Sequence, residues 1–146
     1  MWNRGWTQMN ADHPNMTTQS DRLLPSNELT EKIIGCAYKV SNGLGCGFLE
    51  KVYENALSHE LRKAGLRVRQ QHPIQVLYDG VVVGDYVADL LVEDSVILEL
   101  KAVRELDEVH RAQGLNYLNA TGLHLCLLIN FGNPRADIHR IVQSGH

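Results

Sequence analysis

The segment Ala88-Asp89-Leu90-Leu91-Val92, followed after a short break by Val96-Ile97-Leu98-Glu99-Leu100-Lys101, decides the fold of this chain. Both halves are rich in β-branched and aliphatic residues, which predicts two strands. The three residues between them, Glu93-Asp94-Ser95, predict a tight connection, so the two strands form an antiparallel hairpin. In this pairing Asp89 lies directly across from Glu99.

The strand period of two places Glu99 and Lys101 on one face of the hairpin and Leu98 and Leu100 on the other. Carboxylates about 5 Å apart on facing strands repel unless a cation lies between them, and their hard oxygen atoms favour Mg²⁺ or Mn²⁺. We therefore expect Asp89 and Glu99 to bind one divalent ion, with the carbonyl of Leu100 as a third ligand. Lys101 is suited to activate a water molecule and to stabilise phosphate charge. The spacing alone fits equally well a surface ion pair of Glu99 with Lys101, with Asp89 facing solvent.

Two helices are predicted before these strands. The first begins after Pro25, where Ser26 or Asn27 can cap it. Its apolar stripe consists of Leu29, Ile33, Cys36, Ala37 and Val40. The glycine-rich run 42–47 breaks this helix, and a second helix follows and ends at Gly65. Its apolar positions are Leu49, Val52, Tyr53, Ala56, Leu57 and Leu61.

The remaining elements complete a sheet. A strand containing Ile74 to Tyr78 enters a turn at Asp79-Gly80 and returns as the long strand Val81 to Val92. Asp107 can cap a third helix that Gly122 closes. Its apolar positions are Val109, Ala112, Leu115 and Leu118. Two further strands are predicted, Leu123 to Ile129, covered on both faces, and Asp137 to Val142. This order predicts an α/β domain with a mixed sheet flanked by helices.

Composition bounds the class of protein. The 146 residues, with 44% apolar and 21% charged, predict one domain from residue 25 to 146, preceded by a disordered tail at residues 1–24 that has no apolar period. A net charge of -3 excludes a general basic field, so any nucleic-acid contact must be local. Cys36, Cys46 and Cys126 have no zinc-ligand spacing and predict buried thiols and a cytoplasmic protein. No apolar run is long enough to cross a membrane.

Several ordered motifs together resemble the GxxExxY family, which is grouped with the PD-(D/E)XK nuclease superfamily. The family's glycine, glutamate and tyrosine are matched by Gly47, Glu50 and Tyr53. The segments 88–91, 97–103, 113–118 and 128–132 match in the same order, and the resemblance covers about residues 29–142. Gly114 departs from the pattern, because a larger apolar residue is usual there, and is expected to loosen the helix packing. The superfamily's proline before the aspartate is also absent.

The resemblance implies a restriction-endonuclease-like core, αβββαβ, and assigns roles to individual residues. It implies that Glu50 is an outer acidic residue, Asp89 and Glu99 are metal ligands, Lys101 is the catalytic lysine, and Gln113 is the polar catalytic residue of the following helix. It also matches Tyr53, His110, Asn116 and Tyr117, which we assign to substrate binding.

Two functions follow as hypotheses. The first is a Mg²⁺- or Mn²⁺-dependent nuclease that hydrolyses phosphodiester bonds, preferably of DNA. The alternative is a catalytically silent nucleic-acid-binding or assembly module on the same fold, because the chain is acidic overall. The densest basic cluster, Arg62, Lys63, Arg67 and Arg69, is either a phosphate contact or a solvated helix end. A homodimer is a third expectation, because the chain has little surface beyond its core for embracing a duplex.

Overall fold

The computed structural model describes residues 24–143. The helices are α3 (Asn27–Leu44), α4 (Glu50–Lys63) and α5 (Glu108–Thr121). The strands are β1 (Val68–Tyr78), β2 (Val81–Val92), β3 (Val96–Lys101), β4 (Leu125–Asn130) and β5 (Asp137–Val142). The tail predicted for residues 1–24 lies outside the described residues, except for Leu24.

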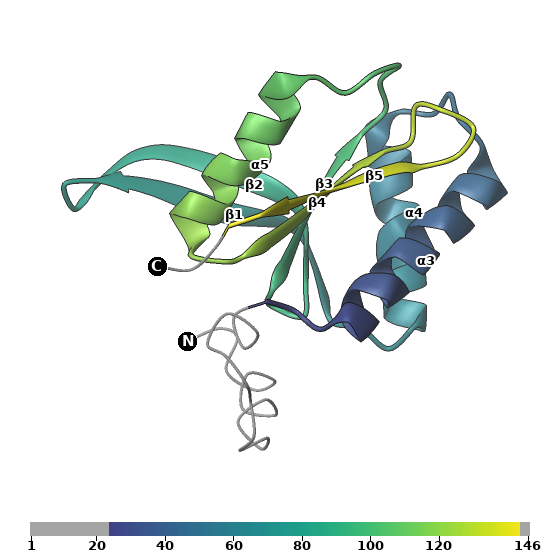
Figure 1. Ribbon diagram of the computed structural model, residues 1–146, viewed down its shortest axis with the longest axis horizontal. Coiled ribbons are helices and arrows are strands. Elements are labelled where there is room, and N and C mark those ends of the chain that lie inside the picture. Colours follow the sequence, from purple (N-terminus) through teal and green to yellow (C-terminus); the bar gives the residue numbers. More distant parts are fainter. Residues whose placement is uncertain (1–23, 144–146) are drawn as a thin grey trace.

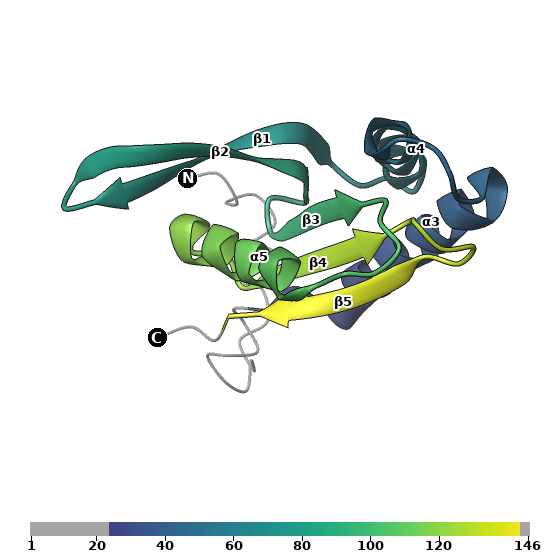
Figure 2. The ribbon, with the colours of Figure 1, turned by 90° about the horizontal axis from the view of Figure 1, so that it is seen from above.

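The strands form one mixed sheet in the order β1-β2-β3-β4-β5. The pairs β1–β2, β2–β3 and β4–β5 are antiparallel, and β3–β4 is parallel. Helix α5 provides the connection between the two parallel strands, and it lies on the sheet face opposite α3 and α4 (Figures 1 and 2). The predicted three-strand meander and the α/β arrangement are confirmed.

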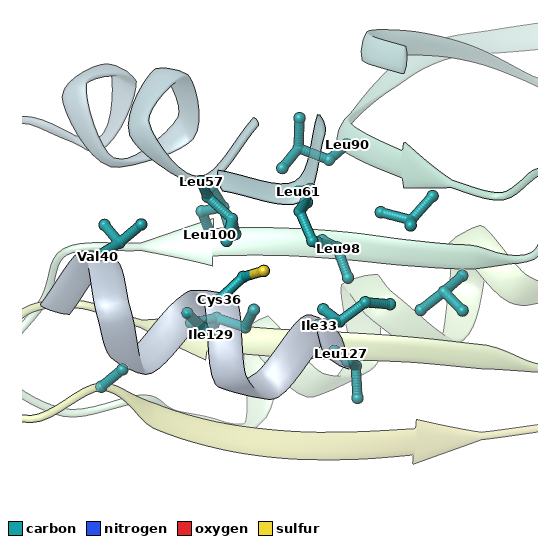
Figure 3. Close-up of a cluster of buried hydrophobic side chains, with 14 of the residues drawn as sticks. Ile33, Cys36, Val40, Leu57, Leu61, Leu90, Leu98, Leu100, Leu127 and Ile129 are labelled. Carbon is teal, nitrogen blue, oxygen red and sulfur yellow. The ribbon is translucent and has the colours of Figure 1, made fainter. Parts of the chain in front are cut away.

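The main core lies between α3, α4 and one face of the sheet (Figure 3). The predicted stripe of α3 is confirmed, with Ile33 and Ala37 fully buried, and Ser26 caps the helix by accepting a hydrogen bond from the Leu29 amide at 3.1 Å. Leu98 and Leu100 of β3 face this core, as the strand period predicts. Glu99 and Lys101 are consequently directed to the opposite face, which α5 covers.

The apolar face of α4 differs from the predicted one at its beginning. Leu49 is 81% exposed and Val52 is 38% exposed, whereas Glu54 and Ser58 are buried. Leu49 is the N-cap residue, so its side chain precedes the first turn that packs on the sheet. Helix α4 therefore presents a polar side chain, Glu54, to the interior.

Helix α5 packs on a face that shares only Leu118 with the predicted apolar stripe. Val109 and Leu115 are exposed, and the buried residues of the helix are Gly114, Tyr117 and Leu118. A Cβ atom at Gly114 would lie 2.6 Å from Cδ1 of Ile141, so the missing side chain allows the helix backbone to approach the sheet closely. The expectation that Gly114 loosens the packing is therefore wrong.

Three smaller points complete the comparison with the sequence. Cys36 and Cys126 are buried as expected, but Cys46 is exposed because it lies in the loop between α3 and α4. Helix α3 continues through residues 42–44 before Gly45 ends it with φ 70°. Within residues 24–143, no helix has the length and apolarity needed to span a bilayer.

Candidate active site

The site is built where β2 and β3 separate. Their backbone ladder ends at the pair Leu90 and Leu98, and beyond it side chains replace the backbone hydrogen bonds. The Asp89 amide donates to Oε2 of Glu99 at 3.1 Å, and the Leu100 amide donates to Oδ2 of Asp89 at 2.8 Å. Asp89 and Glu99 thus lie across from each other, as the hairpin pattern predicts. Each carboxylate uses one oxygen atom to bridge the two strands.

The neighbouring strand β1 is irregular at the same level. Gln71 has φ 55°, a left-handed conformation that is uncommon for a residue with a side chain. Regular pairing of β1 with β2 surrounds it, through Gln70 with Leu90 and His72 with Ala88. Beyond this level, residues 72–88 of the two strands pair only with each other and project past β3 (Figure 2). We call this projection the arm.

Burial gives the carboxylate pair unusual electrostatics. Glu99 is only 5% exposed, and burial followed by repulsion from Asp89 raises the pKa of its carboxyl group to about 8. Burial also raises the pKa of Asp89, while the hydrogen bond from the Leu100 amide acts in the opposite direction. With its pKa at about 8, the Glu99 carboxyl group holds a proton at neutral pH when no cation is present. A bound cation would lower both pKa values, because its positive charge favours the ionised carboxylates.

Two further predicted residues join this pair. Glu50 is the first residue of α4, and its Oε2 accepts a hydrogen bond of 3.4 Å from the Ala102 amide at the end of β3. Lys101 shares the sheet face of Glu99. Burial and Asp89 have the largest effects on the pKa of Glu99. The positive charge of Lys101 lowers this pKa by a smaller amount, and the negative charge of Glu50 raises it. The structure therefore brings Glu50, Asp89, Glu99 and Lys101 together.

The oxygen atoms around the pair fit a hard divalent cation. The Lys101 carbonyl accepts from the Phe131 amide on the β4 side, whereas the Leu100 amide points to Asp89 on the β2 side. Because backbone polar groups of successive strand residues alternate in direction, the Leu100 carbonyl also points to the β2 side. Among the residues that the structure describes, no three His, Cys, Asp or Glu side chains form a metal-binding group. A cation here would thus depend on two carboxylates, the Leu100 carbonyl and water.

A groove of about 900 Å³ lies between the arm and α5 and reaches Lys101. Besides Lys101, four residues with predicted roles line it: Gln113, His110, Asn116 and Tyr117. Nε2 of Gln113 donates to the Tyr117 hydroxyl at 3.0 Å. Burial and the nearby Glu99 raise the pKa of Tyr117 to about 12, so its hydroxyl stays protonated and can donate. Nδ1 of His110 accepts from the Asp107 amide at 3.1 Å, which places the proton of a neutral ring on Nε2.

Tyr53 does not belong to this groove. Its side chain is fully buried on the other face of the sheet, stacked on Phe131 with 4.7 Å between ring centroids. Its hydroxyl donates to the Gly45 carbonyl at 2.7 Å and accepts from the Phe48 amide at 3.3 Å. The assignment of Tyr53 to substrate binding is wrong, because the residue instead fixes the glycine-rich loop that precedes Glu50.

Glu54 is a residue of this region that sequence reasoning missed. It is 4% exposed, and its two oxygen atoms accept from the side-chain amides of Gln70 at 2.7 Å and Gln71 at 2.8 Å. Lys51 lies 3.1 Å from it. The sequence contained a signal for this burial, because Glu54 lies nearly one helical turn before Leu57 and therefore on the buried face of α4. It ties α4, and with it Glu50, to the strand that flanks Asp89.

The arginine side chains of the predicted basic cluster already contact other groups of the protein. Arg67 pairs with Glu93 at 3.4 Å, and Arg69 pairs with Asp94 at 3.3 Å. Arg62 donates to the Val68 carbonyl at 3.1 Å. These contacts neutralise much of the cluster, so the acids of the β2–β3 turn compete with any phosphate for it.

Comparison with known proteins gives a family match for residues 27–141, described as the PD-(D/E)XK nuclease superfamily. Two solved structures are similar to the chain. One is an alkaline exonuclease, LHK-Exo, from Laribacter hongkongensis, with a TM-score of 0.49, 15% identity, and coverage of 64% of this chain and 56% of that chain. The other, SSO0001, has a TM-score of 0.47, 16% identity, and coverage of 66% and 50%. The matched region is therefore about half the length of each. No curated protein matches the chain.

Proposed function

The chain belongs to the PD-(D/E)XK nuclease superfamily, and from this premise we propose that it is a divalent-metal-dependent nuclease that hydrolyses phosphodiester bonds of nucleic acid, DNA in preference. Its mixed sheet, with helices on both faces, is the restriction-endonuclease-like fold. One observation carries the proposal above the others. The half-buried Asp89 and the buried Glu99 face each other at the point where two strands part, and Lys101 follows on the same face.

Each side chain has a role that its position supports. Asp89 and Glu99, with the Leu100 carbonyl, would hold the ion, which when bound supplies positive charge to the phosphate and to the attacking water. Lys101 orients the water and stabilises the charge that develops on the phosphate oxygens. Glu50 adds negative charge at the outer edge of the site. Gln113 lies in the groove where its amide and the Tyr117 hydroxyl can contact the substrate.

Finer points of the proposal rest on chemistry rather than on a bound ligand. Mg²⁺ or Mn²⁺ is proposed because the donors are hard oxygen atoms. The resemblance at Gly47, Glu50 and Tyr53 supports the GxxExxY family within the superfamily. A cytoplasmic location is proposed because the three cysteines of the chain provide no disulfide framework. A homodimer is proposed because one small domain has little surface for holding a duplex.

Cleavage of a nucleic-acid panel with Mg²⁺ or Mn²⁺ tests the proposal. We expect the wild type to cleave, and Asp89→Asn and Lys101→Ala each to lose about 100-fold or more in rate. Lys39→Ala is the control, because this lysine is exposed on α3 and its side chain is 68% accessible. Retention of the wild-type rate in both site variants would disprove the mechanism.

The second candidate, a catalytically silent module, is separated by the same experiment. It predicts nucleic-acid binding by the wild type with no cleavage under any metal condition. The ion pairs that occupy Arg67 and Arg69 argue against a dedicated phosphate-binding patch at that cluster.

A further inference from the structure

Resting on the proposed function, we infer that the groove between the arm and α5 binds a single nucleic-acid strand rather than an intact duplex. The groove is formed by β1 and β2 on one side and by α5 on the other, and Lys101 connects it to the carboxylate pair. Figure 2 shows the arm running beside α5 and projecting past one end of the helix. The groove therefore offers a substrate a path between these two walls to Lys101, on the sheet face of Glu99.

The depth of the carboxylate pair favours a flexible strand. Glu99 is 5% exposed, and Asp89 and Lys101 are only partly exposed. A duplex is stiff, with a persistence length of about 150 base pairs, and it presents its phosphates on the outside of a rod. A single strand can bend so that one phosphate enters the groove while its neighbours remain outside.

The charge of the groove also favours a single strand over a duplex. Proteins that hold duplex backbones use several Lys and Arg side chains. Among the described residues that line the groove, Lys101 is the one that carries a fixed positive charge. The other polar groups are mainly neutral amides, from Gln75, Gln113 and Asn116 among others. Amides serve the exposed edges of unpaired bases, because they both donate and accept hydrogen bonds.

Tyr86 gives the groove a surface on which a base can stack. The residue is 50% exposed, and its ring contacts that of Tyr117, with 6.0 Å between centroids. Gly84 makes room beneath it, since a Cβ there would lie 3.3 Å from Cε2 of Tyr86. The ring thus lies between the arm and Tyr117 of α5, while the residue as a whole remains 50% exposed. Aromatic platforms of this kind accept any base.

The test measures binding by fluorescence anisotropy with labelled oligonucleotides of about 12 nucleotides, within the usual range of single-strand site sizes. Oligodeoxyuridylate, oligouridylate and a DNA duplex of equal length are compared in Ca²⁺, with each strand verified intact on a gel. We expect at least one single strand to bind about tenfold or more tightly than the duplex. Its salt dependence should be shallow, with a log–log slope of about -0.7 per phosphate contacted. The single strand that binds more tightly shows whether the groove prefers deoxyribose or ribose.

Variants of the arm make the test specific. Tyr86→Ala should lower single-strand affinity about 5- to 150-fold, which corresponds to about 1–3 kcal/mol of stacking. Tyr86→Phe should retain the affinity, because stacking needs the ring and not the hydroxyl. Tyr78→Ala is the matched control: this tyrosine is on the same arm and 75% exposed, but does not line the groove. Thermal melts verify that each variant is folded.

Equal affinity for duplex and single strand, or wild-type affinity in folded Tyr86→Ala, would overturn the inference. Loss of cleavage in Asp89→Asn would still support the nuclease in that case. Conversely, a wild type that prefers single strands through Tyr86 but cleaves nothing would retain the inference and overturn the proposed function.

Discussion

Replacement of Glu99 by glutamine is the most informative single change in this protein. Glutamine has nearly the shape of glutamate, and its carbonyl oxygen can still accept the hydrogen bond from the Asp89 amide. The change therefore removes a buried ionisable group while it leaves the strand contact in place. We expect the variant to be more stable than the wild type in the absence of divalent ions.

The magnitude follows from the pKa of Glu99, which rises from its ordinary value of 4.5 to about 8 in the folded protein. Below pH 4.5 the carboxyl group is protonated in both the folded and the unfolded chain, and the wild type keeps its full stability. As the pH rises from 4.5 toward 8, the unfolded chain releases the proton first, so the free energy of unfolding decreases. At about 1.4 kcal/mol for each pH unit, the loss is about 3 kcal/mol at pH 7 and at most about 5 kcal/mol above pH 8.

Urea unfolding in EDTA at pH 5, 7 and 9 measures this effect. The difference in free energy of unfolding between Glu99→Gln and the wild type should be small at pH 5 and grow to several kcal/mol at pH 9. Glu31→Gln, an exposed position on α3, is the control and should change little at any pH. Parallel pH profiles for the wild type and Glu99→Gln would refute the argument, because they would mean that Glu99 is ionised in the folded protein without a cation.

Three other predictions test the ion, the buried tyrosine and a close backbone approach. Mn²⁺ at about 100 times its dissociation constant should stabilise the wild type by about 2.7 kcal/mol in thermal melts, with a gain that shrinks as the pH falls. Asp89→Asn should nearly abolish that gain, and an unchanged gain would remove Asp89 as a ligand. Tyr53→Phe should lower the free energy of unfolding by about 1–2 kcal/mol through loss of its bond to Gly45, yet leave nucleic-acid affinity unchanged in anisotropy titrations. A loss of affinity would return Tyr53 to the substrate site. Gly132→Ala should cost about 3 kcal/mol or more in urea unfolding, because its Cβ would overlap the Val103 backbone, and wild-type stability would contradict that approach.

The sequence was sufficient wherever a pattern is local. The alternation around Glu99 and the three-residue turn fixed the register that places it opposite Asp89, because a strand has only two faces. Ser26, Asp107 and Gly122 delimit their helices as expected, since capping depends on side chains within a few residues. The family pattern added the helix residues His110, Gln113, Asn116 and Tyr117, which the fold gathers in one groove.

The tertiary structure decided what depends on contacts distant in sequence. Periodicity put Val109 and Leu115 on the packed face of α5, but the close approach at Gly114 turned another face to the sheet. Tyr53 fitted a motif that suggested the substrate, yet stacking on Phe131 buries it completely.

The shape of the arm also depends on contacts between residues that are distant in sequence. Its length and the exposure of Tyr86 follow from where β3 stops pairing with β2, and no window of the sequence contains that information. The sequence by itself identified the two candidate carboxylates and the lysine. It also predicted the order of the strands along the chain, because these features depend on residue type and local period. Only the three-dimensional packing determined how deeply the carboxylates lie and that a groove between the arm and α5 leads to Lys101, because burial is a property of the whole fold.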